Sequence, residues 1–183
     1  MKLVIAITGA SGMIYARNLL HYCKDKFEVH LIISKAAEII LQQELKLNKN
    51  YFLEYAKKIY SPDDISAPLA SSSFKADAYI VVPCSNKTLA CIANGISLNL
   101  ITRACEVALK ENRKLIIVNR ETPLSLIALK NLVKLKKAGA TILPAMPGFY
   151  HSPKNFDDIA NFIVGKILDQ LNVSHNFIKY TSE

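Results

Sequence analysis

The chain has 183 residues, of which 51% are hydrophobic and 21% are charged, and its formal net charge is +8. A chain of this length suits one domain with a full core, and no apolar run reaches the ~18 residues of a membrane span. The excess Lys and Arg residues are scattered and are not interleaved with aromatic residues, so the sequence does not favour nucleic acid as a partner.

Apolar runs alternate with helical patterns along the chain. The pattern predicts strands at residues 2–8, 29–34, 79–82, 115–118 and 140–143. It predicts helices at residues 11–23, 36–45, 86–93, 101–111, 125–137 and 156–171. Segment 46–75 is polar and irregular, with one short helix expected near residues 52–59. Residues 1–172 should form the domain, and the polar residues 173–183 a C-terminal tail or arm.

This alternation predicts the α/β class, with a doubly wound parallel sheet in a single-domain, three-layer sandwich of the flavodoxin or Rossmann type. In such folds ligands bind outside the carboxyl ends of the strands, near the point where the strand order reverses. The segments that should share this edge are "TGASG" (8–12), "SKAA" (34–37), "PCSNKT" (83–88), "NRETP" (119–123) and "PAMPGFYH" (144–151).

Several of these strand ends carry groups that suit a phosphate. In "TGASG" two glycines lead into a helix whose N-terminal amides could hold an anion. The segment is neither a G-x-G-x-x-G nor a P-loop pattern, and a plain tight turn is an equal alternative. Ser85 and Thr88 could cap the next helix or bind a phosphate, and Ser34 by itself is best explained as an N-cap.

The segment "NRETP" is more informative. The Arg120 guanidinium fits phosphate oxygens, and Glu121 could act as an acid or a base, although a surface ion pair would also explain the two residues. Arg103 and Lys110 are seven residues apart on one expected helix, so they share a face. Ordinary surface or core positions are the alternatives for the remaining candidates, which are Arg103, Lys110, Glu44, Tyr150 and Lys166.

The four cysteines give no sign of a metal site. Cys23, Cys84, Cys91 and Cys105 form no C-x-x-C pair, and no His lies at zinc-ligand spacing from them. We therefore expect reduced thiols and no metal, with Cys84 as a small buried residue. The N-terminal "MKLVIAITGASG" reaches a glycine turn after too few apolar residues for the core of a signal peptide, so we expect a cytoplasmic protein.

Six segments stand in series: "ITGASGMIYA", "ISKAAEIIL", "VVPCSNKTLA", "LITRACEVALKE", "NRETPLS" and "ILPAMPGFYHSP". In order and spacing they resemble the flavin prenyltransferase (UbiX) family of flavodoxin-like flavoproteins, over about residues 2–171. The resemblance implies that reduced FMN accepts a dimethylallyl group from dimethylallyl monophosphate at N5 and then at C6, without a metal. It also implies delivery of prenylated FMN to UbiD-type decarboxylases, and a homododecamer with sites between subunits.

The resemblance further implies a role for each matching residue. Ser11 would lie near flavin N5, Glu121 would help phosphate to depart, and Glu44 would reach the site of a neighbouring subunit. The prenyl phosphate would be bound by Arg103, Lys110, Tyr150 and Lys166, and the catalytic set would be Ser11, Glu44, Lys110, Glu121 and Tyr150. FMN would contact Gly9, Ala10, Ser11, Ser34, Ser85, Asn86, Lys87, Thr88 and Arg120.

Two alternatives come from other functional classes, an FMN-dependent cysteine decarboxylase and a flavin carrier without catalysis. Such decarboxylases have a catalytic His shortly before the third strand, whereas this chain has no His between His30 and His151. A carrier would not need the cations and the carboxylate of the prenyl-phosphate site. The departures from the family pattern that bear on the shape of the substrate pocket are Ser72, Ile65 and Lys166.

Overall fold

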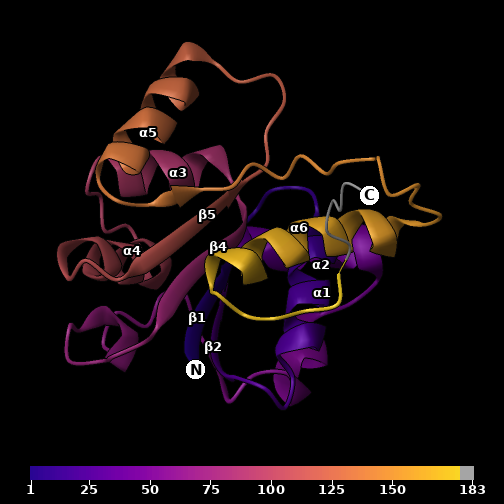
Figure 1. Cartoon of the computed structure of the whole chain (residues 1–183). Coiled ribbons are helices and arrows are strands. Elements are labelled where there is room, and N and C mark those ends of the chain that lie inside the picture. Colours follow the sequence, from indigo (N-terminus) through magenta and orange to yellow (C-terminus); the bar gives the residue numbers. More distant parts are fainter. Residues whose placement is uncertain (178–183) are drawn as a thin grey trace.

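The computed structural model describes residues 1–177 and shows a six-stranded parallel sheet with helices on both faces (Figure 1). The strands lie in the order β3-β2-β1-β4-β5-β6. They are β1 (Lys2–Ile7), β2 (Glu28–Ile33), β3 (Lys58–Tyr60), β4 (Ala78–Cys84), β5 (Lys114–Asn119) and β6 (Thr141–Ile142). The helices are α1 (Met13–Cys23), α2 (Lys35–Leu45), α3 (Asn86–Ala93), α4 (Leu100–Lys110), α5 (Leu126–Lys137) and α6 (Phe156–Gln170). The predicted doubly wound α/β fold is confirmed.

The two faces of the sheet bury separate cores. In β1, Leu3, Ile5 and Ile7 belong to the core beneath α1, α2 and α6, whereas Val4 and Ala6 belong to the core beneath α3, α4 and α5. Side chains alternate along a strand, so a strand covered on both faces must be apolar at every position. This is why β1, β4 and β5 are continuous Val, Ile and Leu runs rather than alternating ones.

The strand order reverses beside β1. From β1 the chain moves outward to β2 and β3, and it then crosses back to β4, which pairs with the other side of β1. The loops that follow β1 and β4 therefore leave the sheet in different directions. In open α/β sheets this separation creates the crevice in which ligands bind, at the carboxyl ends of the strands.

Two sequence predictions about the elements are wrong. The short strand β3 lies where a helix was expected, and the helical turn nearby is a 3₁₀ turn at Lys49–Glu54. Only three residues of β3 pair with β2, so no periodicity marks them in the sequence. The strand β4 does not end before Pro83 but continues to Cys84, with a shift in its register against β5. Pro83 lacks an N–H, yet its carbonyl still accepts the Thr8 N–H at 3.3 Å.

The chain after α6 turns back along that helix (Figure 1). Within the first part of the expected tail, Val173 and Phe177 pack against the core beneath α1 and α6. Residues 178–183 lie outside the described residues, so the predicted division of the chain at residue 172 stays a prediction. Among the helices of residues 1–177, none has the length and apolar character needed to cross a membrane.

Candidate functional site

The reversal point between β1 and β4 opens onto a cavity of about 560 Å³ at the carboxyl edge of the sheet. The loop after β1 and the N-terminal ends of α2, α3 and α4 form its wall. The lining residues are Gly9, Ser34, Lys35, Ala36, Pro62, Asp63, Ser85, Asn86, Lys87, Thr88, Cys91, Leu98, Asn99, Thr102 and Glu121. The structure thus brings together these predicted site residues: Gly9, Ser34, Ser85, Asn86, Lys87, Thr88 and Glu121.

Thr8 ties the loop after β1 to the loop after β4. Its hydroxyl donates to the Pro83 carbonyl oxygen at 2.8 Å and accepts from the Ser85 N–H at 2.8 Å. Thr8 is buried, so losing one of these bonds would leave a polar group unpaired away from water. The two loops that flank the cavity are therefore held at a fixed separation.

Gly9 lets the loop after β1 pass close to the start of α2. A Cβ atom built on Gly9 would lie 2.6 Å from the Ala36 Cβ atom, which is closer than two carbon atoms approach in proteins. Any other residue at this position would push the two backbones apart and widen the cavity. The close approach that a glycine permits is used here, at the cavity wall.

Two serines cap the helices that end at the cavity. The Ser34 hydroxyl accepts from the Ala37 N–H at 3.1 Å, and the Ser85 hydroxyl accepts from the Thr88 N–H at 3.4 Å. Both serines are N-caps, one of the alternatives that the sequence left open for Ser85, and both also line the cavity. The first turns of α2 and α3 keep further unpaired N–H groups and a positive dipole end, which suit a phosphate.

Glu121 reaches the cavity from the loop after β5. Its Oε2 atom accepts from Asn86 Nδ2 at 3.0 Å, and its Oε1 atom accepts from the Thr122 N–H at 3.2 Å. The Oδ1 atoms of Asn86 and of Asn119, at the end of β5, are buried without a hydrogen-bond partner among the described residues. Buried amide oxygens are normally paired, and of these two residues Asn86 lines the cavity whereas Asn119 does not.

Glu44, from the end of α2, supplies the negative charge at the N-terminus of α1. Its carboxylate accepts from the Gly12 N–H at 3.0 and 3.2 Å and from the Met13 N–H at 2.8 Å. The N-cap residue Gly12 has no side chain to cap the helix, so this carboxylate takes that place. Glu44 therefore takes two of the amides that the sequence offered to a phosphate, and the phosphate site at this helix end stays a prediction.

Arg120 and Ser11 are exposed and lie outside the cavity lining. Burial raises the pKa of the Tyr15 phenol, while the charge of Arg120 opposes the rise and that of Glu44 adds to it. The charges of Arg120 and Glu44 therefore both act on the phenol of Tyr15, a residue of α1. Ala10, beside them in sequence, is buried.

Tyr150 and Lys166 meet around one aromatic ring. The Tyr150 ring lies 5.8 Å from the Phe162 ring and almost perpendicular to it, at 77°. The Lys166 Nζ atom lies 5.6 Å from the centroid of the same Phe162 ring. Gly148 permits this packing, since a Cβ atom there would lie 2.9 Å from Tyr150 Cε1 and 3.1 Å from Phe162 Cε2. Tyr150, in the loop before α6, and Lys166, on α6, are thus neighbours of the same ring, and neither of them lines the cavity.

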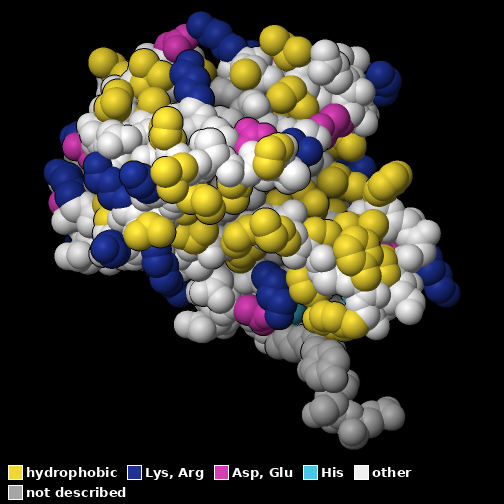
Figure 2. All heavy atoms as spheres, turned by 90° about the horizontal axis from the view of Figure 1, so that it is seen from above, with side chains coloured by type: hydrophobic (Ala, Val, Ile, Leu, Met, Phe, Trp, Pro, Cys, Tyr) yellow, Lys and Arg dark blue, Asp and Glu magenta, His cyan; other side chains and the backbone are white. Residues whose placement is uncertain are grey.

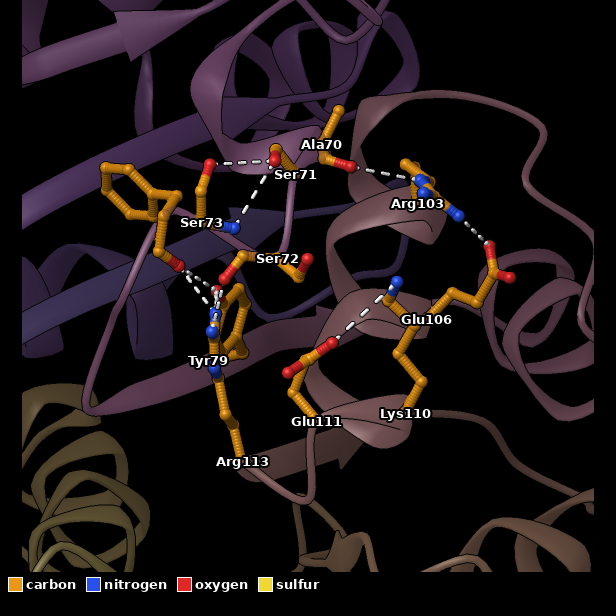
Figure 3. Close-up of polar contacts among 11 residues, drawn as sticks. Ala70, Ser71, Ser72, Ser73, Tyr79, Arg103, Glu106, Lys110, Glu111 and Arg113 are labelled. Carbon is orange, nitrogen blue, oxygen red and sulfur yellow. Dashed lines mark hydrogen bonds and ion pairs between the residues drawn. The ribbon is translucent and has the colours of Figure 1, made fainter.

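Arg103 and Lys110 lie at opposite ends of α4 (Figure 3). Arg103 donates from Nε to the Ala70 carbonyl at 3.1 Å and pairs with Glu106 at 2.9 Å. Lys110 lies 3.8 Å from the Glu111 carboxylate. The first turn of α4 lines the cavity, and at 1.5 Å per residue the Lys110 backbone lies about 12 Å further along the helix. This chain therefore does not bring Lys110 to its own cavity.

Some cavity residues were missed from the sequence. Lys35 and Asp63 form an ion pair of 2.7 Å at the cavity wall. Asp63 lies in segment 46–75, whose sequence is polar and irregular and gives no sign of a binding site. Asn99 accepts from the Thr102 N–H at 3.1 Å and closes a capping box at the start of α4. An Asn directly before an apolar helical run is an N-cap signal, so this helix start could have been found.

The buried thiols are not activated. Burial raises the pKa of the Cys84 thiol well above its usual value and raises the pKa of Cys105 to about 12. A nucleophilic cysteine needs a lowered pKa, so Cys84 is a small buried residue, as the sequence favoured. All four cysteines of the chain are free. Among residues 1–177, no group of three His, Cys, Asp or Glu residues could hold a metal ion.

Comparison with known proteins identifies the family. The Flavoprotein family matches residues 1–168. A flavin prenyltransferase UbiX from Methanocaldococcus jannaschii is 51% identical over 179 residues, which cover 98% of this chain and 97% of that protein. The chain belongs to the UbiX flavin prenyltransferase family. A second UbiX protein, from Thermoplasma acidophilum, is 46% identical over 98% of this chain and 99% of its own length. The predicted family is confirmed, and with it the prediction of a flavin prenyltransferase.

Solved structures of UbiX proteins share the whole fold. A dodecameric FMN-dependent UbiX-like decarboxylase from Escherichia coli O157:H7 has a TM-score of 0.96 and 38% identity, with all of both chains covered. AnUbiX (PadA1), in complex with FMN and dimethylallyl pyrophosphate, has a TM-score of 0.95 and 38% identity over 100% of this chain and 98% of that one. The cysteine decarboxylase TvaF is only 16% identical at a TM-score of 0.67, which shows a common fold alone.

Proposed function

We propose that this UbiX family member joins the dimethylallyl group of dimethylallyl monophosphate to N5 and C6 of reduced FMN and releases phosphate. The observation that carries this proposal is the cavity at the strand-order reversal, where helix N-termini, two serines and the Glu121 carboxylate converge. AnUbiX, which shares the fold over the whole chain, binds FMN together with a dimethylallyl compound. The cavity of this chain would take the same pair of ligands.

The FMN site is supported by groups on the cavity wall. The amides at the starts of α2 and α3, next to Ser34 and Ser85, suit the FMN phosphate. Gly9 packs against Ala36, and this close contact sets the width of the cavity that the flavin ring would enter. Reduced FMN would supply the two nucleophilic positions, N5 and C6. Arg120 would contact the flavin from the side of α1.

Glu121 would assist the departing phosphate. When the C–O bond to the allyl carbon breaks, both electrons leave with the phosphate, so cations and a proton donor lower the barrier. Asn86 donates to Glu121 at 3.0 Å and holds the carboxyl group in the cavity. Tyr150 and Lys166, gathered around Phe162, would hold the donor phosphate. Ser11 would lie near flavin N5, and Glu44 would reach the site of a neighbouring subunit.

A neighbouring copy of the chain would supply the remaining cations. Lys110 lies at the end of α4 that is far from the cavity, so it would serve the prenyl-phosphate site of a neighbouring copy, and Arg103 would be a supporting cation. The relative from Escherichia coli is dodecameric. Hydrophobic side chains also gather on the face that carries α5, where Leu126, Ile127 and Val133 are more than half exposed (Figure 2). Exposed apolar patches of this kind mark surfaces that another protein covers.

The product, prenylated FMN, would pass to a UbiD-type decarboxylase. The proposal includes a reaction without a metal and a cytoplasmic location, which four free thiols suit. Incubation of the FMN-loaded protein with dithionite and either dimethylallyl monophosphate or dimethylallyl pyrophosphate, followed by mass analysis of the flavin, tests the donor. The monophosphate should give the faster prenylation. An aromatic acid added alone should release no CO₂, and CO₂ release would favour a decarboxylase.

A further inference from the structure

A loop at residues 70–74 lies beside α4, the helix that carries two of the predicted cations of the prenyl-phosphate site (Figure 3). The Arg103 Nε atom donates to the Ala70 carbonyl oxygen at 3.1 Å, which fixes the first residue of this loop to the start of the helix. The Ser71 and Ser73 hydroxyls form a hydrogen bond of 2.8 Å with each other, and both residues are exposed. The loop therefore presents a pair of hydroxyl groups to solvent beside α4.

Arg113 holds the rest of this loop (Figure 3). Its Nη2 atom donates to the Ser72 carbonyl oxygen at 2.5 Å. Its Nη1 atom donates to the Phe74 carbonyl oxygen at 2.5 Å and to the Tyr79 hydroxyl oxygen at 3.1 Å. These three partners are neutral, so they leave the charge of Arg113 in place. The two nitrogen atoms of the guanidinium fork each hold one carbonyl group, which the single nitrogen of a lysine cannot reproduce.

The backbone of Arg113 is fixed relative to Lys110, the last residue of α4. The Arg113 N–H donates to the Ala108 carbonyl oxygen of that helix at 2.8 Å. The Asn112 N–H donates to the Leu109 carbonyl oxygen at 3.1 Å. The turn after α4 is therefore closed onto the last turn of the helix. Because Arg113 also binds the loop, the loop keeps a fixed position relative to Lys110.

The two arginines bind the groups of the loop that would repel an anion. The carbonyl oxygens of Ala70, Ser72 and Phe74 each accept from a guanidinium group. A carbonyl oxygen carries a partial negative charge, so one that faced a phosphate would weaken its binding. The groups that stay exposed are the Ser71 and Ser73 hydroxyls. Only one of them donates in their mutual bond, so the other keeps a proton for an acceptor such as a phosphate oxygen.

From these contacts we infer that Arg113 is a positioning residue for the prenyl donor. It holds loop 70–74 so that the loop, together with Arg103 and Lys110, forms one wall of the donor-phosphate site of a neighbouring copy. The inference rests on the proposed function, because it takes Lys110 as a residue that serves the site of a neighbouring copy. Without the guanidinium fork, two carbonyl oxygens of the loop lose their partners and can turn outward, and the prenyl donor is then bound more weakly and out of line.

Arg113→Lys tests this role, because it keeps the positive charge and removes the fork. Single-turnover prenylation of reduced FMN is measured at increasing concentrations of dimethylallyl monophosphate, and FMN affinity is measured by fluorescence titration. The second-order rate constant for the prenyl donor should fall about 10- to 100-fold, since a misplacement of about 1 Å can cost 100-fold. FMN affinity should stay within about twofold of wild type. An equal loss in FMN affinity would overturn the inference.

Tyr79→Phe is the matched control for stability. It removes one partner of Arg113 and leaves both carbonyl bonds, so it should lower the melting temperature and keep the rate constant for the prenyl donor within about twofold. A loss in Tyr79→Phe as large as that in Arg113→Lys would assign the effect to stability and overturn the inference.

Mixed oligomers distinguish a role at the neighbour's site from a general loss of structure. Arg113 and Lys110 would act from the same copy, and Glu121 from the copy that holds the flavin. Arg113→Lys protein refolded with Glu121→Gln protein should therefore exceed the summed activity of the separate proteins at low concentrations of the prenyl donor. Refolded with Lys110→Met protein, it should show no such gain. A gain with both partners, or with neither, would overturn the inference. Absence of prenylation by wild type would instead refute the proposed function.

Discussion

The substitution Glu121→Gln separates the proton chemistry of this side chain from its shape. In the wild type, Glu121 accepts from the Thr122 N–H at 3.2 Å and from Asn86 Nδ2 at 3.0 Å. A glutamine keeps an oxygen for the Thr122 N–H but places its NH₂ group against Asn86 Nδ2. Two donors would then face each other. The Asn86 Oδ1 atom is buried and unpaired among the described residues, so rotation of that amide by half a turn restores a hydrogen bond. The stability change should therefore stay within about 1 kcal/mol.

The same variant should keep FMN binding within about twofold of wild type, because a neutral amide replaces the carboxyl group without changing its volume. Loss of an acid–base group typically slows a reaction by about 10²- to 10⁴-fold, and we expect single-turnover prenylation to fall within this range. The assay is anaerobic mixing with dimethylallyl monophosphate and mass analysis of quenched flavin. Glu54→Gln, which removes an exposed carboxylate paired with Lys24, is the control. Prenylation within threefold of wild type would refute the acid role of Glu121.

Three other predictions concern the cavity, its flanking helix and the assembly. Gly9→Ala should weaken FMN binding at least tenfold in a fluorescence titration, because its Cβ atom would lie 2.6 Å from a neighbouring Cβ; unchanged affinity would contradict the close approach. Glu44→Ala should remove the cap of α1 and lower the free energy of unfolding by about 1 kcal/mol, which lowers the melting temperature by roughly 2–4 °C. An unchanged melting temperature would show that water replaces the carboxylate. Lys110→Met and Glu121→Gln proteins, each nearly inactive, should regain activity when unfolded and refolded together, because mixed oligomers contain some intact sites. Failure of mixed oligomers to gain activity would contradict sharing of sites between copies.

Local patterns were sufficient for most of the fold. Continuous apolar runs located β1, β2, β4 and β5, and the helix α3 was predicted with the bounds that the structure shows. The three-residue strand β3 was missed, because its pairing with β2 depends on a neighbouring strand rather than on its own composition. The sequence predicted that the strand ends before Pro83, because proline has no N–H. The strand continues past it, and the Pro83 carbonyl oxygen still accepts a hydrogen bond from Thr8.

The site was predictable in outline, because parallel strands place their carboxyl ends at one edge. The partners of its residues were not. Glu44 contacts Gly12 across 32 residues of sequence, and no local pattern reports such a contact. Helix periodicity predicted that Arg103 and Lys110 share a face of their helix. Periodicity gives only the direction around the helix, however, and Lys110 lies too far along the helix axis to reach the cavity. Such residues can be placed only when the neighbouring copies are considered.

The proposed reaction transfers a prenyl group to flavin and releases the phosphate of the donor. Its most direct test is one anaerobic reaction of the FMN-loaded, reduced protein with dimethylallyl monophosphate, in which inorganic phosphate and flavin mass are measured in the same sample. We expect one phosphate to be released for each flavin that gains a five-carbon unit. Phosphate release without a heavier flavin, or an unchanged flavin with intact donor, would contradict it.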